Sequence, residues 1–452
     1  MKEYIKIASG QGFWGDLIDA PLHQAEKGHI DYLMMDYLAE VTMSILQKQK
    51  QKNPLYGYAR DIPPLMEKLL PIIEEKRFKV ITNGGGVNPL ACRDEIFLIA
   101  SKLGVKNLKI GVVMGDDILN RLDGFINGGI TFKNMESGET IDRNHRKFIS
   151  ANVYFGAEPI VRALKEGADI VITGRVTDTG LTLAPMIHEF GWSMTDWDKM
   201  AVGTIAGHII ECGAQASGGN FLGDWENVPD MAHIGFPIVE AYPDGNFFIT
   251  KHENTGGLVS VETVSEQLVY EIGDPHEYIT PDCIADFSTV KLEQAGKDRV
   301  RVFNIKGRPS TDFYKVSMSF NDGYKAFSQL TYSAPDALKR AQAADKILRT
   351  RLDRLGLDFS EIRTEYLGYN SCHGPIAKNH DLNEVVLRIG VRAKEKSIIE
   401  RFAKEIAPFI LTGPPGVTGF AGGRPKSSDV VAYWPALMPK NKVQPEVIVE
   451  SI

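Results

Sequence analysis

The segment Ala201–Ala216 places polar side chains at helical spacing, and their types could carry proton-transfer chemistry. At i, i+4, i+7, i+8 and i+11 stand Thr204, His208, Glu211, Cys212 and Gln215, so a helix would carry them on one face. A histidine with a carboxylate one turn away can act as a general acid/base pair, because the carboxylate fixes the tautomer and raises the imidazole pKa. We expect this role for His208 and Glu211.

The same face allows other interpretations. His208, Glu211 and Cys212 could ligate a metal, although helical spacing alone is weak evidence for one and we assign none. Cys212 could be a catalytic nucleophile, although a thiol inside a helix more often serves packing. A structural polar face is the remaining alternative.

Gly10–Gly15 has the spacing of a dinucleotide-binding fingerprint, and Asp36 stands where an acid would bind the ribose hydroxyls. Two residues oppose this interpretation. Asp16 would bring negative charge to the pyrophosphate, and Pro21 interrupts the helix whose N-terminus should receive it. We therefore expect no nicotinamide cofactor, and we interpret this loop, Asp16 included, as binding another ligand or as a tight turn.

Two further glycine-rich loops could donate backbone N–H groups to an anionic ligand or an oxyanion. One follows a predicted strand, and in it Asn88 and Pro89 suit the start of a helix. The other closes the polar helix. Flexible connections are the alternative. The predicted binding residues in these loops are Asn83, Gly84, Gly85, Gly86, Asn88, Gly218, Gly219 and Asn220.

Two arginines are candidates for binding an anionic group. Arg175 stands at the carboxyl end of a buried strand, where a guanidinium could clamp a carboxylate with two hydrogen bonds. Asp178, nearby, is assigned to the same site or to capping the next helix. Arg424 is the single charge of the proline- and glycine-rich loop Leu411–Pro425, which suits an anionic ligand or a subunit contact.

The elements that must position these residues alternate between strand and helix in the first half of the chain. Helix-like Ala91–Leu103 and Glu158–Gly167 separate short apolar strands. This order predicts an α/β fold with a mostly parallel sheet, and ligands bind outside the carboxyl ends of such strands. The predicted strands are Tyr4–Ala8, Ile30–Met35, Lys79–Thr82, Leu108–Met114 and Asp169–Thr173.

In the second half strand-like runs dominate and two helices are interspersed, which predicts an α+β domain of split-βαβ type. Its two helices are expected at Pro335–Leu355 and Ser397–Leu411. We place an α/β domain at residues 1–230 and the α+β domain at 231–452. The predicted strands are Phe247–Lys251, Val300–Phe303, Phe313–Phe320, Lys325–Tyr332, Glu361–Tyr369 and Glu384–Val391.

The bulk composition is that of an average globular protein. The chain has 452 residues and a formal net charge of -7, which offers no basic track for nucleic acid or anionic lipid. No apolar stretch approaches the roughly 20 residues that span a bilayer. The start of the chain lacks a signal-peptide pattern, and the four cysteines form no CxxC pair. We expect a cytoplasmic protein that binds neither nucleic acid nor membrane.

Several blocks together resemble one family. GFWGD, DYLMMDYLAE, TNGGGVNPLAC, GRVTDTGLTLAPMIHEFGW, AGHIIECGAQASGGN, EQLVYEIGDPHEYITPD and GPPGVTGFAGGRP look like the signature blocks of the acyclic terpene utilisation (AtuA) family. They run from residue 12 to about residue 425, in matching order. The resemblance implies a role in bacterial catabolism of branched acids and acyl-CoA thioesters. It also implies a small ferredoxin-like partner subunit, because longer members carry such a domain at their C-terminus.

The function that we expect is a lyase, a hydratase or dehydratase, acting on a branched or unsaturated carboxylic acid or its acyl-CoA ester. Such chemistry needs an acid/base pair, an oxyanion stabiliser and an anchor for the carboxylate or thioester. We assign these roles to His208 with Glu211, to the two glycine loops and to Arg175. The alternatives are an NAD-dependent oxidoreductase and a non-catalytic subunit of an acyl-CoA-processing complex. A homo-oligomer is expected.

Overall fold

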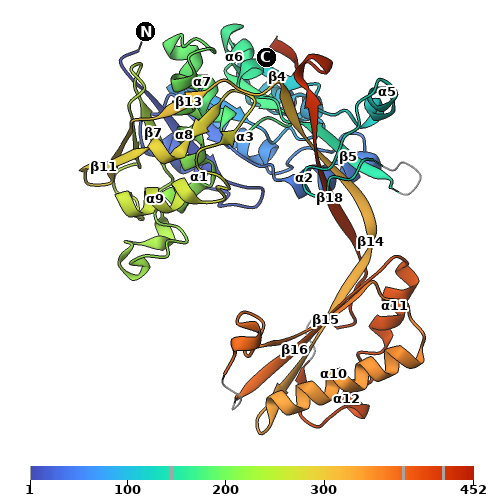
Figure 1. Cartoon of the computed structure of the whole chain (residues 1–452). Helices are drawn as coiled ribbons and strands as arrows, with labels where there is room; N and C mark the ends of the chain where they lie inside the picture. The colour runs from blue at the N-terminus through green and yellow to red at the C-terminus, as the bar shows by residue number, and fades with distance from the viewer. Residues whose placement is uncertain (1, 142–145, 379–381, 420–422) are drawn as a thin grey trace. The chain divides into compact units, whose positions relative to one another are not determined.

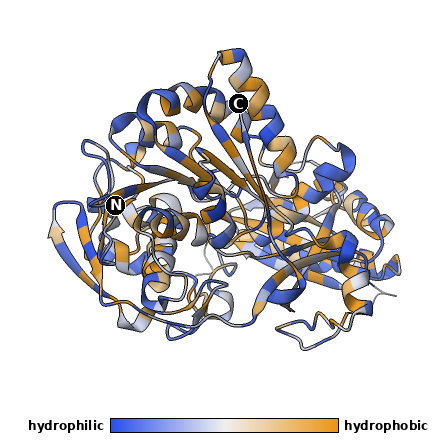
Figure 2. Ribbon diagram, turned by 90° about the horizontal axis from the view of Figure 1, so that it is seen from above, coloured by the Kyte–Doolittle hydropathy of each residue, from blue (hydrophilic) through white to orange (hydrophobic). Residues whose placement is uncertain are grey.

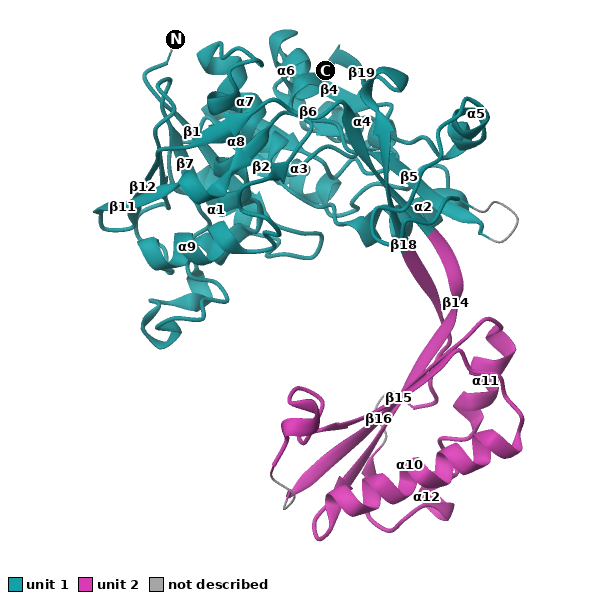
Figure 3. Ribbon diagram, viewed as in Figure 1, with its two compact units in different colours: residues 1–319, 433–452 teal, residues 320–432 magenta. Residues whose placement is uncertain are grey.

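The computed structural model describes residues 2–141, 146–378, 382–419 and 423–452 (Figure 1). The chain divides into two compact units (Figure 3). Unit 1 comprises residues 1–319 and 433–452, and unit 2 comprises residues 320–432. The domain boundary expected at residue 230 lies within unit 1.

Unit 1 is built on a ten-stranded sheet of order β11-β12-β8-β7-β1-β2-β3-β6-β4-β19. The five central strands are parallel, and those on either side are antiparallel. The bounds of the central strands are Ile5–Gln11 (β1), Tyr32–Met35 (β2), Lys79–Thr82 (β3), Ile170–Thr173 (β6) and Lys109–Met114 (β4). Those of the outer strands are Lys291–Gly296 (β11), Arg299–Phe303 (β12), Phe247–Thr250 (β8), Ile238–Ala241 (β7) and Glu446–Ser451 (β19).

The sheet is therefore mixed, and the expectation of a mostly parallel sheet holds only for its centre. The physical reason lies in the short connections. β7 and β8 are joined by a tight turn in which Gly245 has a φ of 91° and Tyr242 N donates to Asn246 O, and strands so joined must pair antiparallel. Because β7 also pairs with β1, the chain beyond residue 230 extends the same sheet.

Helices cover both faces of the parallel centre. On one face α1 (Ala20–Lys27), α3 (Ile62–Lys76) and α4 (Pro89–Leu103) pack around side chains such as Leu33 and Val80. On the other face lie α6 (Glu158–Lys165), α7 (Gly180–Phe190) and α8 (Trp197–Glu211). The central strands are buried on both sides, which explains their continuous apolar sequences. In Figure 2 the apolar colour runs along these strands.

Three shorter groups of elements complete unit 1. Helix α2 (Glu40–Lys52) follows β2, and α5 (Leu122–Asn127) follows β4. Helix α9 (Val261–Val269) packs on the end of α8. The strands β9 (Tyr278–Ile279), β10 (Ile284–Asp286) and β13 (Lys306–Arg308) form a small sheet against α8, while β5 (Phe148–Val153) pairs with β14 (Phe313–Ser333).

Unit 2 is an antiparallel sheet with helices on one face. The residues of β14 from 320 onward pair with β16 (Glu384–Ala393), which pairs with β15 (Glu361–Leu367). The helices α10 (Ala337–Arg354) and α11 (Lys396–Lys404) correspond to the two helices expected from the sequence. The other elements are α12 (Phe409–Thr412), β17 (Val417–Gly419) and β18 (Ser428–Pro439), which runs from unit 2 into unit 1.

Candidate functional site

The carboxyl ends of β1, β2, β3 and β6 bring the sequence-predicted loops of unit 1 together. These strands are parallel neighbours, and the residues that follow them are Gly12, Asp36, Asn83 and Gly174. A Cβ on Gly85 would lie 2.7 Å from the carbonyl oxygen of Thr173, so the Gly84–Gly86 loop touches the end of β6. These loops and Arg175 therefore lie at one edge of the sheet, at the carboxyl ends of its parallel strands.

Asp36 and Asn83 form a buried polar pair at this edge. Asn83 Nδ2 donates to Asp36 Oδ1 at 2.6 Å, and Asn83 Oδ1 accepts from the backbone N–H of Tyr37 at 2.8 Å. Both side chains are buried. Burial raises the pKa of Asp36 well above its ordinary value, the Asp178 charge raises it further, and Arg175 opposes both. The protonated form of Asp36 is therefore favoured relative to an exposed aspartate.

Arg175 is buried and committed to partners inside the protein. Its Nη1 lies 3.1 Å from Asp178 Oδ1 and donates to the carbonyl of Leu38 at 2.8 Å, while Nη2 lies 3.3 Å from Asp178 Oδ2. Its guanidinium stacks 4.0 Å above the centre of the Tyr154 ring. Its two terminal nitrogens thus have partners inside the protein, whereas its buried Nε has no hydrogen-bond partner among the described residues, and the role of Arg175 as a clamp for a substrate carboxylate stays a prediction.

Asp178 is more than a helix cap. The N-cap of α7 is Thr179, and Asp178 instead pairs with Arg175 while 32% of its side chain stays exposed. Burial raises the pKa of Asp178, and the Arg175 charge and a hydrogen bond with Asp36 oppose that rise. Asp36 and Asp178 are thus two interacting carboxyl groups with raised pKa values, and Asp178 is the more exposed of the two.

The helix that was expected to carry the polar stripe is α8. It begins at Trp197 and ends at Glu211, and a 3₁₀ turn, Gly213–Ser217, continues the predicted stretch. His208 Nδ1 lies 2.9 Å from Glu211 Oε1, and His208 Nε2 lies 3.1 Å from the carbonyl of Gln267. Both ring nitrogens are therefore occupied, and the imidazole packs edge-on against Phe287. Its neighbour on the stripe, Thr204, contacts Cys283 Sγ at 3.6 Å.

His208 and Glu211 shift the pKa values of one another. Burial lowers the pKa of His208, but the Glu211 carboxylate and the Gln267 carbonyl outweigh it, so the pKa is raised overall. For Glu211, burial and the Asp178 charge outweigh the His208 charge, so the pKa is raised overall. Glu211 Oε2 is buried and accepts no hydrogen bond from any described residue. It is the atom of this pair that remains available for proton transfer.

Cys212 does not have the properties of a nucleophile. It follows Glu211 at the end of α8 and is partly exposed. Burial and the neighbouring Glu211 carboxylate raise the pKa of its thiol to about 12. At neutral pH it is therefore a thiol and not a thiolate, and only the thiolate is a good nucleophile.

The glycines after β1 serve close packing. A Cβ on Gly12 would lie 2.7 Å from the carbonyl carbon of Cys212 and 2.8 Å from Gly213 N. The Gly12 N–H donates to Asp16 Oδ2 at 2.9 Å, so Asp16 closes its own turn. Helix α1 begins only at Ala20 and holds Pro21 in its first turn, which corrects the expectation that Pro21 interrupts a helix. In this turn the Asp16 carboxylate accepts the hydrogen bond of the Gly12 N–H, a donor that a bound pyrophosphate would need.

Several amides of the other glycine loops also have internal acceptors, and their role as oxyanion donors stays a prediction. Gly84 N donates to Thr82 Oγ1 and Gly86 N to the carbonyl of Asn83, while Asn88 Nδ2 donates to the carbonyls of Pro54 and Tyr56. After α8, Gly218 N and Gly219 N donate to the carbonyls of Gln215 and Ala214. Asn220 takes a left-handed φ of 57°. These loops shape the edge of the site with small residues.

Three polar side chains near Arg175 were not predicted from the sequence. Glu40 at the start of α2 accepts from Tyr154 Oη at 3.3 Å and from Lys315 Nζ at 3.4 Å. Burial raises the pKa of Glu40, but its hydrogen bonds and the Lys315 and Arg175 charges outweigh it and lower the pKa overall. Glu40, Tyr154 and Lys315 come from distant parts of the chain, so no local spacing could have found them.

Tyr278 and Asp116 complete the surroundings. The Tyr278 hydroxyl is buried near Glu211 and Asp178, and its pKa is raised. Asp116 Oδ2 accepts from the N–H of Arg175 and from Asn152 Nδ2, both at 2.9 Å, and so fixes the backbone that carries the guanidinium.

Some expected features lie elsewhere. Arg424 belongs to unit 2, and residues 420–422 of its loop lie outside the described residues. Within the described ranges, no three or more His, Cys, Asp or Glu side chains are grouped so that they could hold a metal ion. Within the same ranges, no helix is both long and apolar enough to cross a membrane.

Comparison with known families agrees with the sequence blocks. Residues 5–449 match the family described as acyclic terpene utilisation family protein AtuA. The chain belongs to the AtuA family. The family name links the chain to a catabolic role, and with that to an enzyme.

Other comparisons add little to the family assignment. A comparison with curated proteins finds no match. A solved structure of prephenate dehydratase from Streptococcus mutans is similar over 39% of this chain and 65% of that chain, at 11% identity and a TM-score of 0.13. The match thus spans just under two thirds of that protein, and the score is too low for any argument about this AtuA chain.

Proposed function

We propose that this AtuA-family chain is a hydratase or dehydratase that acts by acid/base catalysis on a branched, unsaturated or hydroxylated acyl group. The observation that supports it most is the proximity of two kinds of carboxyl group. Glu211 keeps a buried oxygen without a hydrogen bond, and it interacts with Asp178, which in turn interacts with Asp36; burial raises the pKa values of all three. Carboxyl groups whose surroundings separate their pKa values are typical of sites with an acid and a base.

The proposed reaction takes Glu211 as ionised and Asp36 as protonated. The Glu211 carboxylate takes the proton from the carbon next to the substrate carbonyl. The proton of the Asp36–Asp178 pair passes to the hydroxyl on the neighbouring carbon, and that C–O bond breaks and releases water. The electron pair of the broken C–H bond becomes the new C=C bond. The reverse sequence adds water to a 2-enoyl group.

The other residues position this pair. The Arg175 charge stabilises the Asp178 carboxylate that remains after proton donation. The His208 charge lowers the pKa of Glu211 against the burial that raises it, and so favours the carboxylate form. Because Arg175 already binds Asp178, we propose that the substrate is an acyl thioester, which needs no cation for a carboxylate, and the free acid is the weaker candidate.

A direct assay tests this proposal. The purified chain would be given the coenzyme A thioester of a 3-hydroxy acid branched at C3, and the conjugated 2-enoyl thioester would be followed by its ultraviolet absorbance. In deuterium oxide the hydration direction should place deuterium at C2, detected by mass spectrometry. Cys212→Ser should stay active, while Glu211→Gln should lose activity. Absence of turnover with branched thioesters and with their free acids would favour a non-catalytic subunit.

A further inference from the structure

The sheet of unit 2 has one covered and one open face. Side chains that alternate along its strands, such as Leu330 and Leu387, pack under α10 and α11. The intervening residues, Lys325 and Phe327 among them, therefore point to the opposite face, because successive side chains of a strand alternate. The residues of this open face belong to unit 2, whereas the carboxyl groups of the candidate site belong to unit 1.

The open face contains a groove of about 670 Å³, which is within the usual size of small-molecule sites. Phe327 lines the groove with 63% of its surface exposed. Its partner across the strands is Gly390, where an added Cβ would meet no atom within 4 Å. The ring therefore has a flat, open surface beside a residue without a side chain. A large aromatic ring so exposed inside a groove marks a ligand-contacting position.

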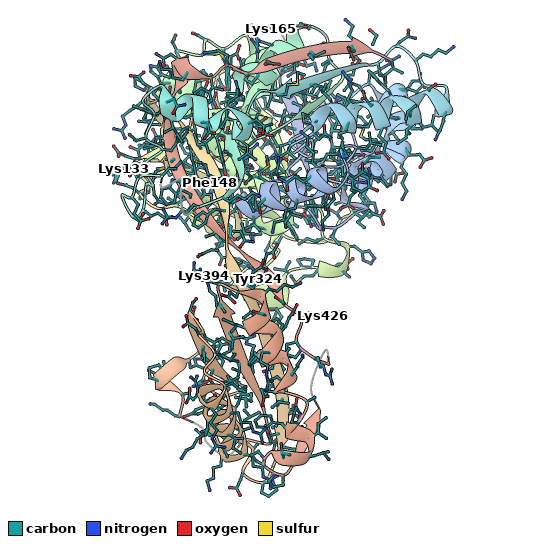
Figure 4. All side chains as sticks on the ribbon, turned by 90° about the vertical axis from the view of Figure 1, so that its right-hand side faces the viewer. Lys133, Phe148, Lys165, Tyr324, Lys394 and Lys426 are labelled. Carbon is teal, nitrogen blue, oxygen red and sulfur yellow. The ribbon has the colours of Figure 1, made fainter. Side chains whose placement is uncertain are left out.

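The rim of the groove is basic. Its charged lining residues are Lys325, Arg363, Arg392, Arg424 and Lys426 against the single acid Glu361. Arg392 forms an ion pair with Asp322, and Arg363 forms one with Glu365. Lys325, Arg424 and Lys426 form no ion pair with any described residue, and we call these three the unpaired cations; Figure 4 labels Lys426. An open aromatic ring with cations that lack counter-charges suits a planar ring that carries anionic groups.

We propose that this groove binds a nucleotide, whose base stacks on Phe327 and whose phosphate groups contact the unpaired cations. Every base has a flat face, so stacking on an exposed phenylalanine needs no particular sequence of hydrogen bonds. Lysine and arginine side chains are the usual partners of phosphate oxygens. The same chemistry is offered by a free nucleoside diphosphate and by the nucleotide end of coenzyme A. The proposal is independent of the reaction proposed for unit 1.

The test is calorimetric titration of the full chain with adenosine 3′,5′-bisphosphate, ADP and adenosine. We expect saturable binding of one or both nucleotides and at least tenfold weaker binding of adenosine, which lacks phosphate. Phe327→Ala should weaken nucleotide binding about tenfold, and Phe327→Tyr should restore it. Lys426→Glu should weaken binding at least tenfold and flatten its dependence on salt. Because these side chains are exposed, the variants should keep the melting temperature of the parent.

Matched controls lie outside the groove. Leu411→Ala removes an apolar side chain that is 90% exposed, and Lys339→Glu reverses a charge on α10, which covers the other face. Neither should change nucleotide affinity. Tighter binding of adenosine 3′,5′-bisphosphate than of ADP identifies the coenzyme A end, and the reverse order identifies a free nucleotide.

Three results would overturn the proposal. One is the lack of saturable binding of either nucleotide at millimolar concentration. Another is unchanged affinity in both Phe327→Ala and Lys426→Glu. The third is much tighter binding of a single-stranded oligouridylate than of either nucleotide, which would make the face a surface for RNA.

Discussion

His208 and Glu211 lie one turn apart on α8, and the Nδ1 atom of the first is 2.9 Å from the Oε1 atom of the second. The other ring nitrogen of His208 meets the carbonyl of Gln267, so the imidazole has no nitrogen left for a substrate. Glu211, in contrast, keeps Oε2 without a hydrogen bond. In the usual acid/base pair the histidine transfers the proton and the carboxylate orients it. Here the two roles are exchanged. Glu211 is the candidate for proton transfer, and His208 is a positioning residue.

The first prediction concerns Glu211. Glu211→Gln keeps the hydrogen bond to His208 within reach but cannot take a proton, so turnover should fall by roughly two to four orders of magnitude. The measurement is kcat on a branched acyl thioester, with Glu262→Gln on α9 as a control that should match the parent. A loss in Glu211→Gln smaller than tenfold would contradict the assignment.

The second prediction concerns His208. Its charge lowers the pKa of Glu211, so His208→Gln should raise that pKa and move the acid limb of kcat/KM to higher pH. At the pH optimum the variant should lose less activity than Glu211→Gln. A pH profile of both variants and the parent checks this. If the limb stays in place while activity falls as far as in Glu211→Gln, the imidazole itself transfers the proton.

Much of this site could be predicted from local patterns. The helical spacing of His208 and Glu211 predicted their contact, because residues three positions apart on a helix face the same way. The strand order placed Arg175 and Asn83 at one edge, since parallel strands end together. The roles within the contact could not be predicted. They depend on the Gln267 carbonyl, which comes from another helix.

The partners of Arg175 show the same limit. Its position after a buried strand was correctly predicted. In the folded chain, however, its guanidinium contacts the Leu38 carbonyl, the Tyr154 ring and the Asp178 carboxylate. Two of these come from other parts of the sequence, and no spacing rule connects them. The glycine loops illustrate a related ambiguity. Glycine can expose backbone amides to a ligand or permit close packing, and at Gly12 and Gly84 the neighbouring atoms show packing.

The third prediction concerns the proton of the Asp36–Asp178 pair. An amide at position 36 can still accept through its oxygen from Asn83 Nδ2 and Leu38 N, so Asp36→Asn should fold. It removes the group that holds the proton. Dehydration should fall about a hundredfold, within the range for losing a general acid, and the alkaline limb of the pH profile should disappear. An intact alkaline limb in this variant would assign the acid to another residue, with Tyr278 the next to replace.

The fourth prediction concerns stability and pH. Burial raises the pKa of Asp116 from 3.8 to about 7, so the folded chain binds this proton more tightly than the unfolded chain. The resulting stabilisation is fully present below pH 3.8 and is lost as the pH rises through about 7. Asp116→Asn cannot ionise. Relative to the parent, its melting temperature should therefore rise from pH 5 to about pH 7 and level off at higher pH, measured by differential scanning calorimetry in matched salt. A difference that does not change with pH would contradict this.

The last prediction concerns Gly12, where β1 meets the end of α8. A methyl group there would lie 2.7 Å and 2.8 Å from backbone atoms of Cys212 and Gly213, and backbone atoms cannot rotate away as a flexible side chain can. Gly12→Ala should therefore destabilise unit 1 by about 1–3 kcal/mol. It should also shift Glu211, because the displaced residues follow it directly. The control is Gly124→Ala in α5, where the added Cβ meets no atom within 4 Å and a helical alanine is favoured over glycine by about 0.5–1 kcal/mol. Melting temperature and kcat of both variants are the measurements. If Gly12 instead served a ligand, Gly12→Ala would weaken substrate binding, seen as a higher KM, and leave the melting temperature of the free protein unchanged.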